Sequence, residues 1–261
     1  MRIGGRPRQI ELDDIVAAGR DIGLRELSLG GVASRLGVSS AALYRHVENR
    51  WGLEQLVGES LLADLELPDD PAADVPTQLL TFGIALFDFV VDPPGLAPYV
   101  QTLFPRGEAG RRLLSEETAA IERRGYSTDA AIVLCSAVAT QAIGHAAAED
   151  AQRARAEGWE ARRAEAVEGM RDIGRLHEAH HRLPQLSMPR YTRLMLAATV
   201  RAIVDILPPD RDVGEVFGEL ESQVEASEPP SRDVATSHTS STPQTPSTSH
   251  TPSSLTPAKD L

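Results

Sequence analysis

The sequence lacks the alternating runs of Val, Ile, Thr and aromatic residues from which half-buried β-strands are built. Hydrophobic residues make up 41% of its 261 residues, enough for a packed core, but aromatic residues make up only 4%. Alanine and leucine dominate the apolar set, and both lose little side-chain entropy in a helix. The sequence therefore predicts an all-α fold.

Two segments rich in proline or polar residues divide the chain. Residues 67–76 contain three prolines and three aspartates, which end one helix and precede another. Of the 35 residues from Ser227 to Leu261, 22 are Ser, Thr or Pro, too polar to bury the surface that folding requires. We expect an N-terminal domain over 1–66, a helical domain over 72–226 and a disordered tail over 227–261. Prolines and glycines predict helices in the second domain near 74–92, 95–103, 108–124, 127–156, 159–180, 189–207 and 212–225.

The N-terminal domain is expected to begin with an amphipathic helix from Glu11 to Leu24, ended by Gly23. Its apolar face comprises Leu12, Ile15, Val16, Gly19 and Ile22. Ser28 can cap a second helix, which Gly37 ends because a tight turn needs a residue that tolerates positive φ. Two short helices separated by a glycine turn and supported by a first helix predict a helix-turn-helix.

Ser39 is expected to cap the third helix, Ser40 to Val47, which buries Leu43 and Val47. A fourth helix starts at Asn49 and Arg50. Its apolar set is Trp51, Leu53, Leu56, Val57, Leu61 and Leu65.

The outward positions of the third helix carry no acidic residue, although the chain has a net charge of −12. Residues 1–50 hold eight arginines against six acidic residues, so the negative charge lies in the rest of the chain. An acidic body can still present a basic face to DNA. An ordinary helical hairpin is the alternative, but its solvent face would be expected to carry Glu or Asp.

Three segments together resemble the DNA-binding domain of tetracycline-repressor-type (TetR) regulators. They are Gly-Arg-Pro-Arg at 5–8, Leu-Gly-Val-Ser-Ser-Ala-Ala-Leu-Tyr-Arg-His-Val at 36–47, and Asn49-Arg50. The resemblance covers roughly residues 6–65. It implies an all-α homodimer that binds a double-stranded DNA operator through its N-terminal helices, and a C-terminal domain that holds a small-molecule effector and the dimer interface. Effector binding would change the spacing of the two recognition helices and release the operator, as in a repressor.

The resemblance also assigns roles to individual residues. Ser40, Ala41 and Ala42, after the cap Ser39, would face base edges, with Tyr44 and His46 on phosphates. Helix N-termini favour anions, so Ser28, Gly30 and Arg50 would lie by the backbone. Arg6 and Arg8 would follow the backbone or enter a minor groove. Small base-facing residues make no bidentate match, so specificity would lean on Arg45, DNA shape or water. Open alternatives are a core role for Tyr44 and a capping role for His46.

The segment His177-Glu178-Ala179-His180-His181 matches the H-E-x-x-H pattern of zinc proteases. It lies at a predicted helix end, without a Gly-x-x-His extension or an evident third ligand. Histidines that complement a helix dipole are the simpler interpretation. The sequence also has no Gly-rich phosphate loop and no nucleophile elbow. We therefore expect no enzyme activity, metal or cofactor; a zinc hydrolase and an architectural DNA-binding protein without effector remain the alternatives.

The C-terminal domain is expected to hold the effector between its helices. Candidate lining residues are Phe82, Leu86, Phe89, Val90, Tyr99, Phe104, Leu134, Val138, Gln141 and His145. Gln141 and His145 stand out because polar groups on an apolar helix need partners. A plain core role is the alternative for any of them. Alanine-rich stretches at 130–148 and 194–206 would let helices of two subunits approach closely in a four-helix dimer interface.

The sequence gives no sign of export or membrane insertion. Met1 to Ile10 has no apolar segment behind it, and Cys135 is the only cysteine, so no internal disulfide can form. The longest apolar stretch, 130–148, is interrupted by polar residues and is interpreted as a buried helix. The expected location is the cytoplasm.

Overall fold

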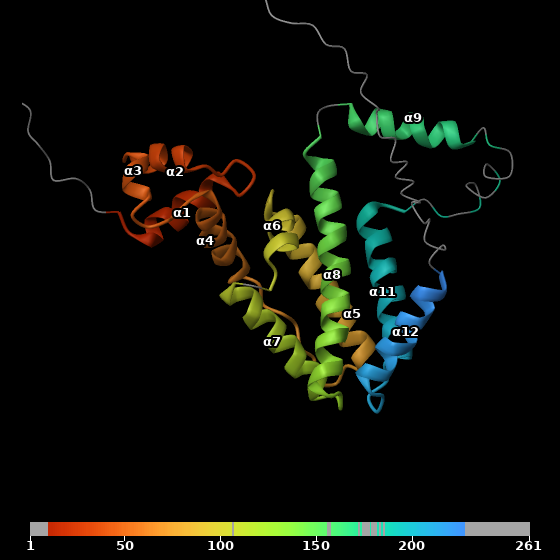
Figure 1. The fold of residues 1–261 in the computed structure, drawn as a ribbon. Helices are drawn as coiled ribbons and strands as arrows, with labels where there is room; N and C mark the ends of the chain where they lie inside the picture. Colours follow the sequence, from red (N-terminus) through yellow and green to blue (C-terminus); the bar gives the residue numbers. More distant parts are fainter. Residues whose placement is uncertain are drawn as a thin grey trace, which may run out of the picture. The chain divides into compact units, whose positions relative to one another are not determined.

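The computed structural model describes residues 10–105, 107–155, 158–171 and 186–227, together with residues 173, 178, 182 and 184. Over these residues the chain forms helices joined by turns and contains no strand (Figure 1). The all-α prediction is confirmed.

The first four helices are α1 (Leu12–Ile22), α2 (Leu29–Leu36), α3 (Ser40–Leu43) and α4 (Arg50–Leu62). They share a core in which five side chains are fully buried: Ile15, Val32, Leu43, Leu53 and Val57. α3 is shorter than predicted, because residues 44–46 continue as hydrogen-bonded turns and not as α-helix.

Two residues assigned to apolar faces of these helices lie outside the core. Leu12 is 47% exposed and Trp51 is 59% exposed. Both lie in the first turn of their helices. α1 buries the predicted Ile15 and Gly19 together with Ala18, which was not predicted. The predicted core of the first and fourth helices is therefore wrong at these two positions.

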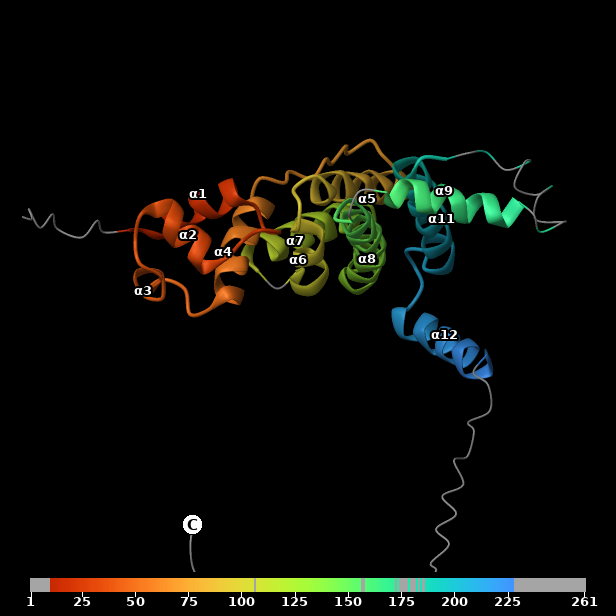
Figure 2. The same ribbon diagram turned by 90° about the horizontal axis from the view of Figure 1, so that it is seen from above.

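The remaining helices follow the predicted segments to within a few residues, except that the helix predicted at 159–180 ends at Arg171. They are α5 (Val75–Val91), α6 (Leu96–Leu103), α7 (Glu108–Glu122), α8 (Thr128–Arg153), α9 (Trp159–Arg171), α11 (Met188–Ile206) and α12 (Val213–Ser227). α8 is the central helix, and it packs against α5, α6, α7 and α11 (Figure 2). Alanines on its buried positions let these neighbours approach closely, as Ala139, Ala142 and Ala146 illustrate.

α8 is also long and apolar enough to cross a membrane by length and composition. Its buried residues recur on several sides of the helix, as expected for a helix surrounded by others. The interpretation of residues 130–148 as a buried helix is confirmed.

Contacts group residues Met1–Leu220 into one compact unit, and the second unit, Glu221–Leu261, is described only as far as residue 227. The predicted boundary at 67–76 falls in the connection between α4 and α5. Most of the predicted tail, from residue 228 onward, lies outside the described residues.

A polar network fixes the α4–α5 connection to α7. The Arg124 guanidinium donates to the carbonyl oxygens of Asp70 (2.7 Å) and Ala73 (3.0 Å). The Gln78 amide donates to the carbonyl of Pro68 (2.9 Å) and to the carboxylate of Glu117 (3.1 Å). Glu117 is 1% exposed, and burial raises the pKa of its carboxyl to about 7.

Candidate nucleic-acid interface and cavity

The turn between α2 and α3 has the geometry that the sequence predicts. The Ser28 hydroxyl caps α2 by accepting the Gly31 N–H at 3.1 Å. Gly37 adopts the left-handed conformation, with φ 69° and ψ 32°, and the Val38 N–H then donates to the Ala33 carbonyl at 3.0 Å. This bonding ends α2 sharply and directs the chain into α3.

α3 and the turn after it are anchored by Leu43 and Val47, which are 0% and 6% exposed. Ala42 is half-buried, and the remaining side chains face solvent: Ser39, Ser40, Ala41, Tyr44, Arg45 and His46. Tyr44 is 55% exposed, which excludes the core role considered for it. Ser39 occupies the N-cap position of α3, but its side chain makes no capping hydrogen bond, so the capping prediction is wrong in that detail.

Arg50, which follows the turn after α3, is paired with an acidic residue of its own helix. The Arg50 Nε lies 2.6 Å from Glu54 Oε1, and the Arg50 side chain is 63% exposed. Asn49 caps α4 by accepting the Gly52 N–H at 3.1 Å, so Arg50 stands in the first turn as predicted. Ser28 and Gly30 are exposed at the start of α2. Arg6 and Arg8 lie outside the described residues.

An open cavity of about 260 Å³ lies between α6, α7 and α8. Its walls are Val100 and Gln101 of α6, Phe104 and Pro105 after it, Leu114 of α7, and Ser136, Ala139, Thr140, Ile143 and Gly144 of α8. The surface is mainly apolar, with an amide and two hydroxyls as polar groups. Pockets of this kind hold small organic molecules.

The structure brings one of the expected pocket residues, Phe104, to this cavity. The others lie elsewhere. Phe89 is half-buried against the core, Tyr99 borders a different opening between α4 and α6, and the following are buried in the core: Phe82, Leu86, Val90, Leu134 and Val138.

Gln141 and His145 lie on another side of α8. The Gln141 Nε2 is 3.1 Å from the His145 Nε2, and the His145 ring meets the Tyr191 ring of α11 edge-on with centroids 6.2 Å apart. Each residue of a helix is rotated about 100° from the previous one, so Gln141 faces away from the direction of Thr140. The two polar groups satisfy each other and do not line the cavity.

Sequence reasoning missed the α8 residues that do line the cavity, although a signal was present. Ser136, Thr140 and Gly144 recur every four residues on an otherwise apolar helix and therefore share one face. The contributions of Gln101, Pro105 and Leu114 had no comparable signal, because they depend on how α6 and α7 pack.

The H-E-x-x-H segment and the single cysteine lie apart from the helix-turn-helix and the cavity. His177, His180 and His181 of the H-E-x-x-H segment lie outside the described residues, whereas Glu178 is described and exposed. Cys135 is fully buried in α8, and burial raises the pKa of its thiol to about 12. A protonated, buried thiol is a poor nucleophile, which agrees with a structural role for Cys135.

No protein-family model and no curated protein matches the sequence. The chain is similar to several solved structures. Apo ActR from Streptomyces coelicolor is 20% identical, with a TM-score of 0.64 over 77% of this chain and 97% of that chain. ActR in complex with actinorhodin, described as a TetR family protein, is 20% identical, with a TM-score of 0.66 over 76% and 96% of the two chains.

A variant of TetR from Acinetobacter baumannii AYE in complex with minocycline is 16% identical, with a TM-score of 0.54 over 76% of this chain and 98% of that chain. This chain thus spans nearly the whole length of each of these proteins. It has the all-α fold of TetR-family transcriptional regulators, as the helix-turn-helix residues suggested.

Proposed function

We propose that the chain is a DNA-binding transcriptional regulator, acting in the cytoplasm as a homodimeric repressor that a small molecule releases from a palindromic operator. The observation that carries the proposal is the surface of α3. Together with the turn that follows, at residues 44–46, it exposes side chains that are small, hydroxylated or basic, and none is acidic in a chain of net charge −12. A surface of this kind fits a major groove and tolerates the phosphates beside it.

The residues of this surface, the half-buried Ala42 included, divide into two expected roles. Ser40, Ala41 and Ala42 would face base edges, where Ala contacts a thymine methyl and Ser bonds to several bases. Tyr44, Arg45 and His46 would reach the phosphates or flanking bases, with Ser28 and Gly30 at the start of α2 beside the backbone. Arg50 would exchange part of its contact with Glu54 for a phosphate.

Selection of bound duplexes from a random DNA pool tests the proposal. A palindrome with half-sites about one helical turn or slightly more apart is expected for a symmetric dimer. Recovery of no motif would overturn the proposal. A reporter gene behind the recovered operator then separates a repressor, which lowers its expression, from an activator.

The proposed dimer uses the outer face of α11. Tyr191 and Leu194 are 42% and 41% exposed, and the exposed alanines Ala198 and Ala202 continue the same stripe at helical spacing. An apolar helix face left in water favours association with a second copy. Sedimentation equilibrium of wild type and Leu194→Glu checks this: we expect a dimer for the first and a monomer for the second, and a monomeric wild type would contradict the interface.

The proposed effector site is the cavity between α6, α7 and α8. ActR has been solved with actinorhodin and TetR with minocycline, so proteins of this fold accommodate organic ligands. Here Ser136, Thr140 and Gln101 offer hydrogen bonds within otherwise apolar walls, which suits a mainly apolar molecule carrying a few hydroxyl or carbonyl groups.

A panel of such molecules tests the site by operator release and by the shift in melting temperature. Ser136→Leu fills the cavity from an exposed position and should abolish both responses while operator binding persists. Thr128→Val, at the exposed start of the same helix and outside the cavity, serves as the control. Equal responses of wild type and Ser136→Leu would place the effector elsewhere.

A further inference from the structure

Glu59 of α4 reaches out of the N-terminal helices and contacts two other helices. Its Oε1 accepts the hydroxyl hydrogen of Tyr99, on α6, at 2.9 Å. Its Oε2 accepts the backbone N–H of Ala109, in the first turn of α7, at 2.8 Å. One carboxylate therefore links α4 to both α6 and α7.

The contact with α7 completes the start of that helix. Gly107 occupies the N-cap position and has no side chain to accept the free N–H groups there. The Glu59 carboxylate supplies the missing acceptor and places a negative charge at the positive end of the helix dipole. α7 thus obtains its N-terminal cap from a residue that lies about 50 positions earlier in the chain.

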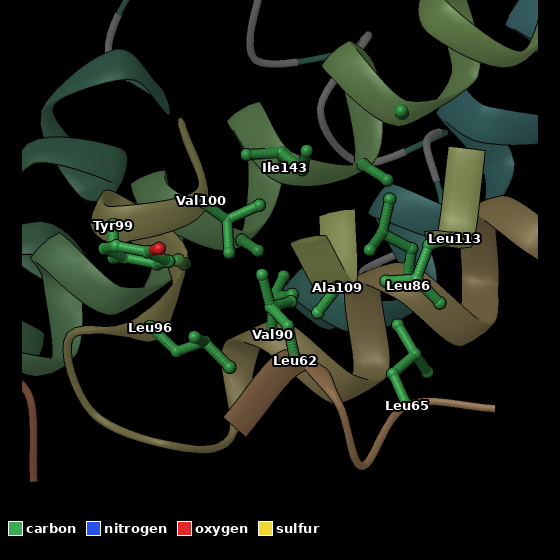
Figure 3. Close-up of a cluster of buried hydrophobic side chains, with 14 of the residues drawn as sticks. Leu62, Leu65, Leu86, Val90, Leu96, Tyr99, Val100, Ala109, Leu113 and Ile143 are labelled. Atoms are coloured by element: carbon green, nitrogen blue, oxygen red, sulfur yellow. The ribbon is translucent and has the colours of Figure 1, made fainter. Parts of the chain in front are cut away.

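The backbone around Glu59 is shaped for these contacts. A Cβ atom on Gly58 would lie 2.4 Å from Cε1 of Tyr99, and a Cβ atom on Gly107 would lie 1.8 Å from Cδ of Glu59. Neither position admits a side chain without displacement of its neighbour. Leu62 of α4, three residues after Glu59, lies among buried side chains of the other helices, including Val90 and Ala109 (Figure 3).

The two elements that Glu59 contacts also form walls of the proposed effector cavity. Val100 and Gln101 follow Tyr99 directly on α6, and Leu114 lies on α7. Between the two helices, Pro105 lines the cavity and lies close against α7 at Gly110, whose added Cβ would be 3.0 Å from the Pro105 Cα. A ligand that moves α6 or the start of α7 therefore moves the two groups that donate hydrogen bonds to Glu59, the Tyr99 hydroxyl and the Ala109 N–H.

We propose that Glu59 is the positioning residue that couples the cavity to the DNA-reading surface. α4 carries Leu53 and Val57 of the core that supports α1 to α3, so a shift of α4 reorients those helices. Displacement of Tyr99 or Ala109 changes the lowest-energy position of the Glu59 carboxylate, and α4 follows it. The inference rests on the proposed function and adds the residue through which the two sites communicate.

A second polar link joins the N-terminal helices to the rest of the chain. The Arg25 guanidinium, before α2, donates to Asp150 of α8 at 2.7 Å, and Asp150 also accepts the N–H of Gly95 at the start of α6. This pair does not involve Glu59. It is expected to keep the N-terminal helices docked when the Glu59 contacts are weakened.

Coupling between two sites is reciprocal, so DNA binding must also affect the start of α7, beside the cavity. This effect can be measured without knowing the effector. The experiment measures hydrogen exchange of the amides at 107–111 in the full chain, with and without the duplex recovered from the random pool. In wild type we expect the duplex to change these rates at least threefold. In Glu59→Gln we expect a change of less than 1.5-fold, with the affinity for the duplex within threefold of wild type.

Asp64→Asn is the matched control, because Asp64 lies just beyond α4 and pairs with Arg20 of α1. It should respond as wild type does. Tyr99→Phe keeps the carboxylate and removes one of its two donors, so it should reduce the response to less than half even if Glu59→Gln does not fold. A wild-type response in both Tyr99→Phe and a folded Glu59→Gln would overturn the inference, as would wild type that binds the duplex without any change at 107–111. Failure of the proposed function shows itself earlier, as the absence of any recovered duplex.

Discussion

α3 and α8 use their side chains in opposite ways. α3 has four residues, of which only Leu43 is buried, and it leaves nearly all its chemistry in solvent. α8 has 26 residues and buries side chains on several sides, so that Ser136, Thr140 and Gly144 are left to form one wall of an open cavity. In α3, side-chain identity decides what can be bound. In α8, the packing of the neighbouring helices decides which side chains are left free to contact a ligand.

Small residues suit both helices, for different reasons. On α3, Ser40, Ala41 and Ala42 leave room for another molecule to approach the backbone. On α8, alanines admit α5, α6, α7 and α11. Exposed and buried positions should therefore respond differently to substitution. Substitution of an exposed residue on α3 should alter DNA binding without altering stability. Substitution of a buried residue should lower stability, with or without an effect on binding.

The largest effect is expected where α3 is itself buried. Leu43→Ala removes a fully buried side chain and should lower the free energy of unfolding by about 3 kcal/mol, as large-to-small core substitutions do. Chemical denaturation measures it. Ser40→Ala, one turn away and exposed, should change stability by less than about 0.5 kcal/mol. A similar loss in both variants would show that α3 is not divided into an anchor and a binding face.

A smaller effect, with a distinctive pH profile, is expected at Glu117. Burial holds its pKa at about 7 in the folded chain against 4.5 as the ordinary value, so the folded state favours the protonated form. The stability from this group is complete below about pH 4.5 and is lost as the pH rises through 7. Glu117→Gln mimics the protonated carboxyl and should be more stable than wild type by roughly 2–3 kcal/mol at pH 8, with little difference at pH 4.5.

The measurement is denaturant unfolding of both chains across that pH range. Glu116→Gln, at the exposed neighbouring position, is the control and should follow wild type. A constant difference between Glu117→Gln and wild type at all pH values would mean that Glu117 does not titrate in this window.

Tyr44→Ala should affect binding and leave folding unchanged. The side chain is 55% exposed, so its loss should alter stability by less than about 0.5 kcal/mol. Loss of a phosphate contact should weaken binding about tenfold, equivalent to about 1.4 kcal/mol, to specific and unrelated duplexes alike. Fluorescence anisotropy checks this, and Tyr44→Phe separates the hydroxyl from the ring. Weakening restricted to one sequence would assign Tyr44 to base recognition instead.

Much of the fold follows from local signals in the sequence. Ser28, Gly37 and Asn49 act through neighbours within a few residues, and they fix the helix-turn-helix as predicted. Pro and Gly positions likewise marked most helices of the second half to within a few residues, although the helix predicted to reach residue 180 ends at Arg171. Leu12 and Trp51 show that an apolar side chain at a helix start can remain exposed.

The cavity and the coupling could not be predicted in the same way. A rotation of α8 by one residue would turn Gln141 toward the cavity in place of Thr140. The rotation of α8 is set by its packing against α5, α6, α7 and α11, which no local pattern in α8 reveals. Glu59 meets Tyr99 and Ala109 across separations of 40 and 50 residues, so its role depends on tertiary packing. No periodicity in the sequence distinguishes it from any other glutamate on a helix.

The most direct test of the central claim is a repeated selection from the random pool with Ala42→Gln. A glutamine can form a bidentate pair with adenine, which alanine cannot. If α3 reads the groove, the variant should recover a motif with the same half-site spacing and a changed base preference at one position in each half-site, at unchanged stability. Recovery of the wild-type motif without any change would contradict the assignment of α3 as the DNA-reading helix.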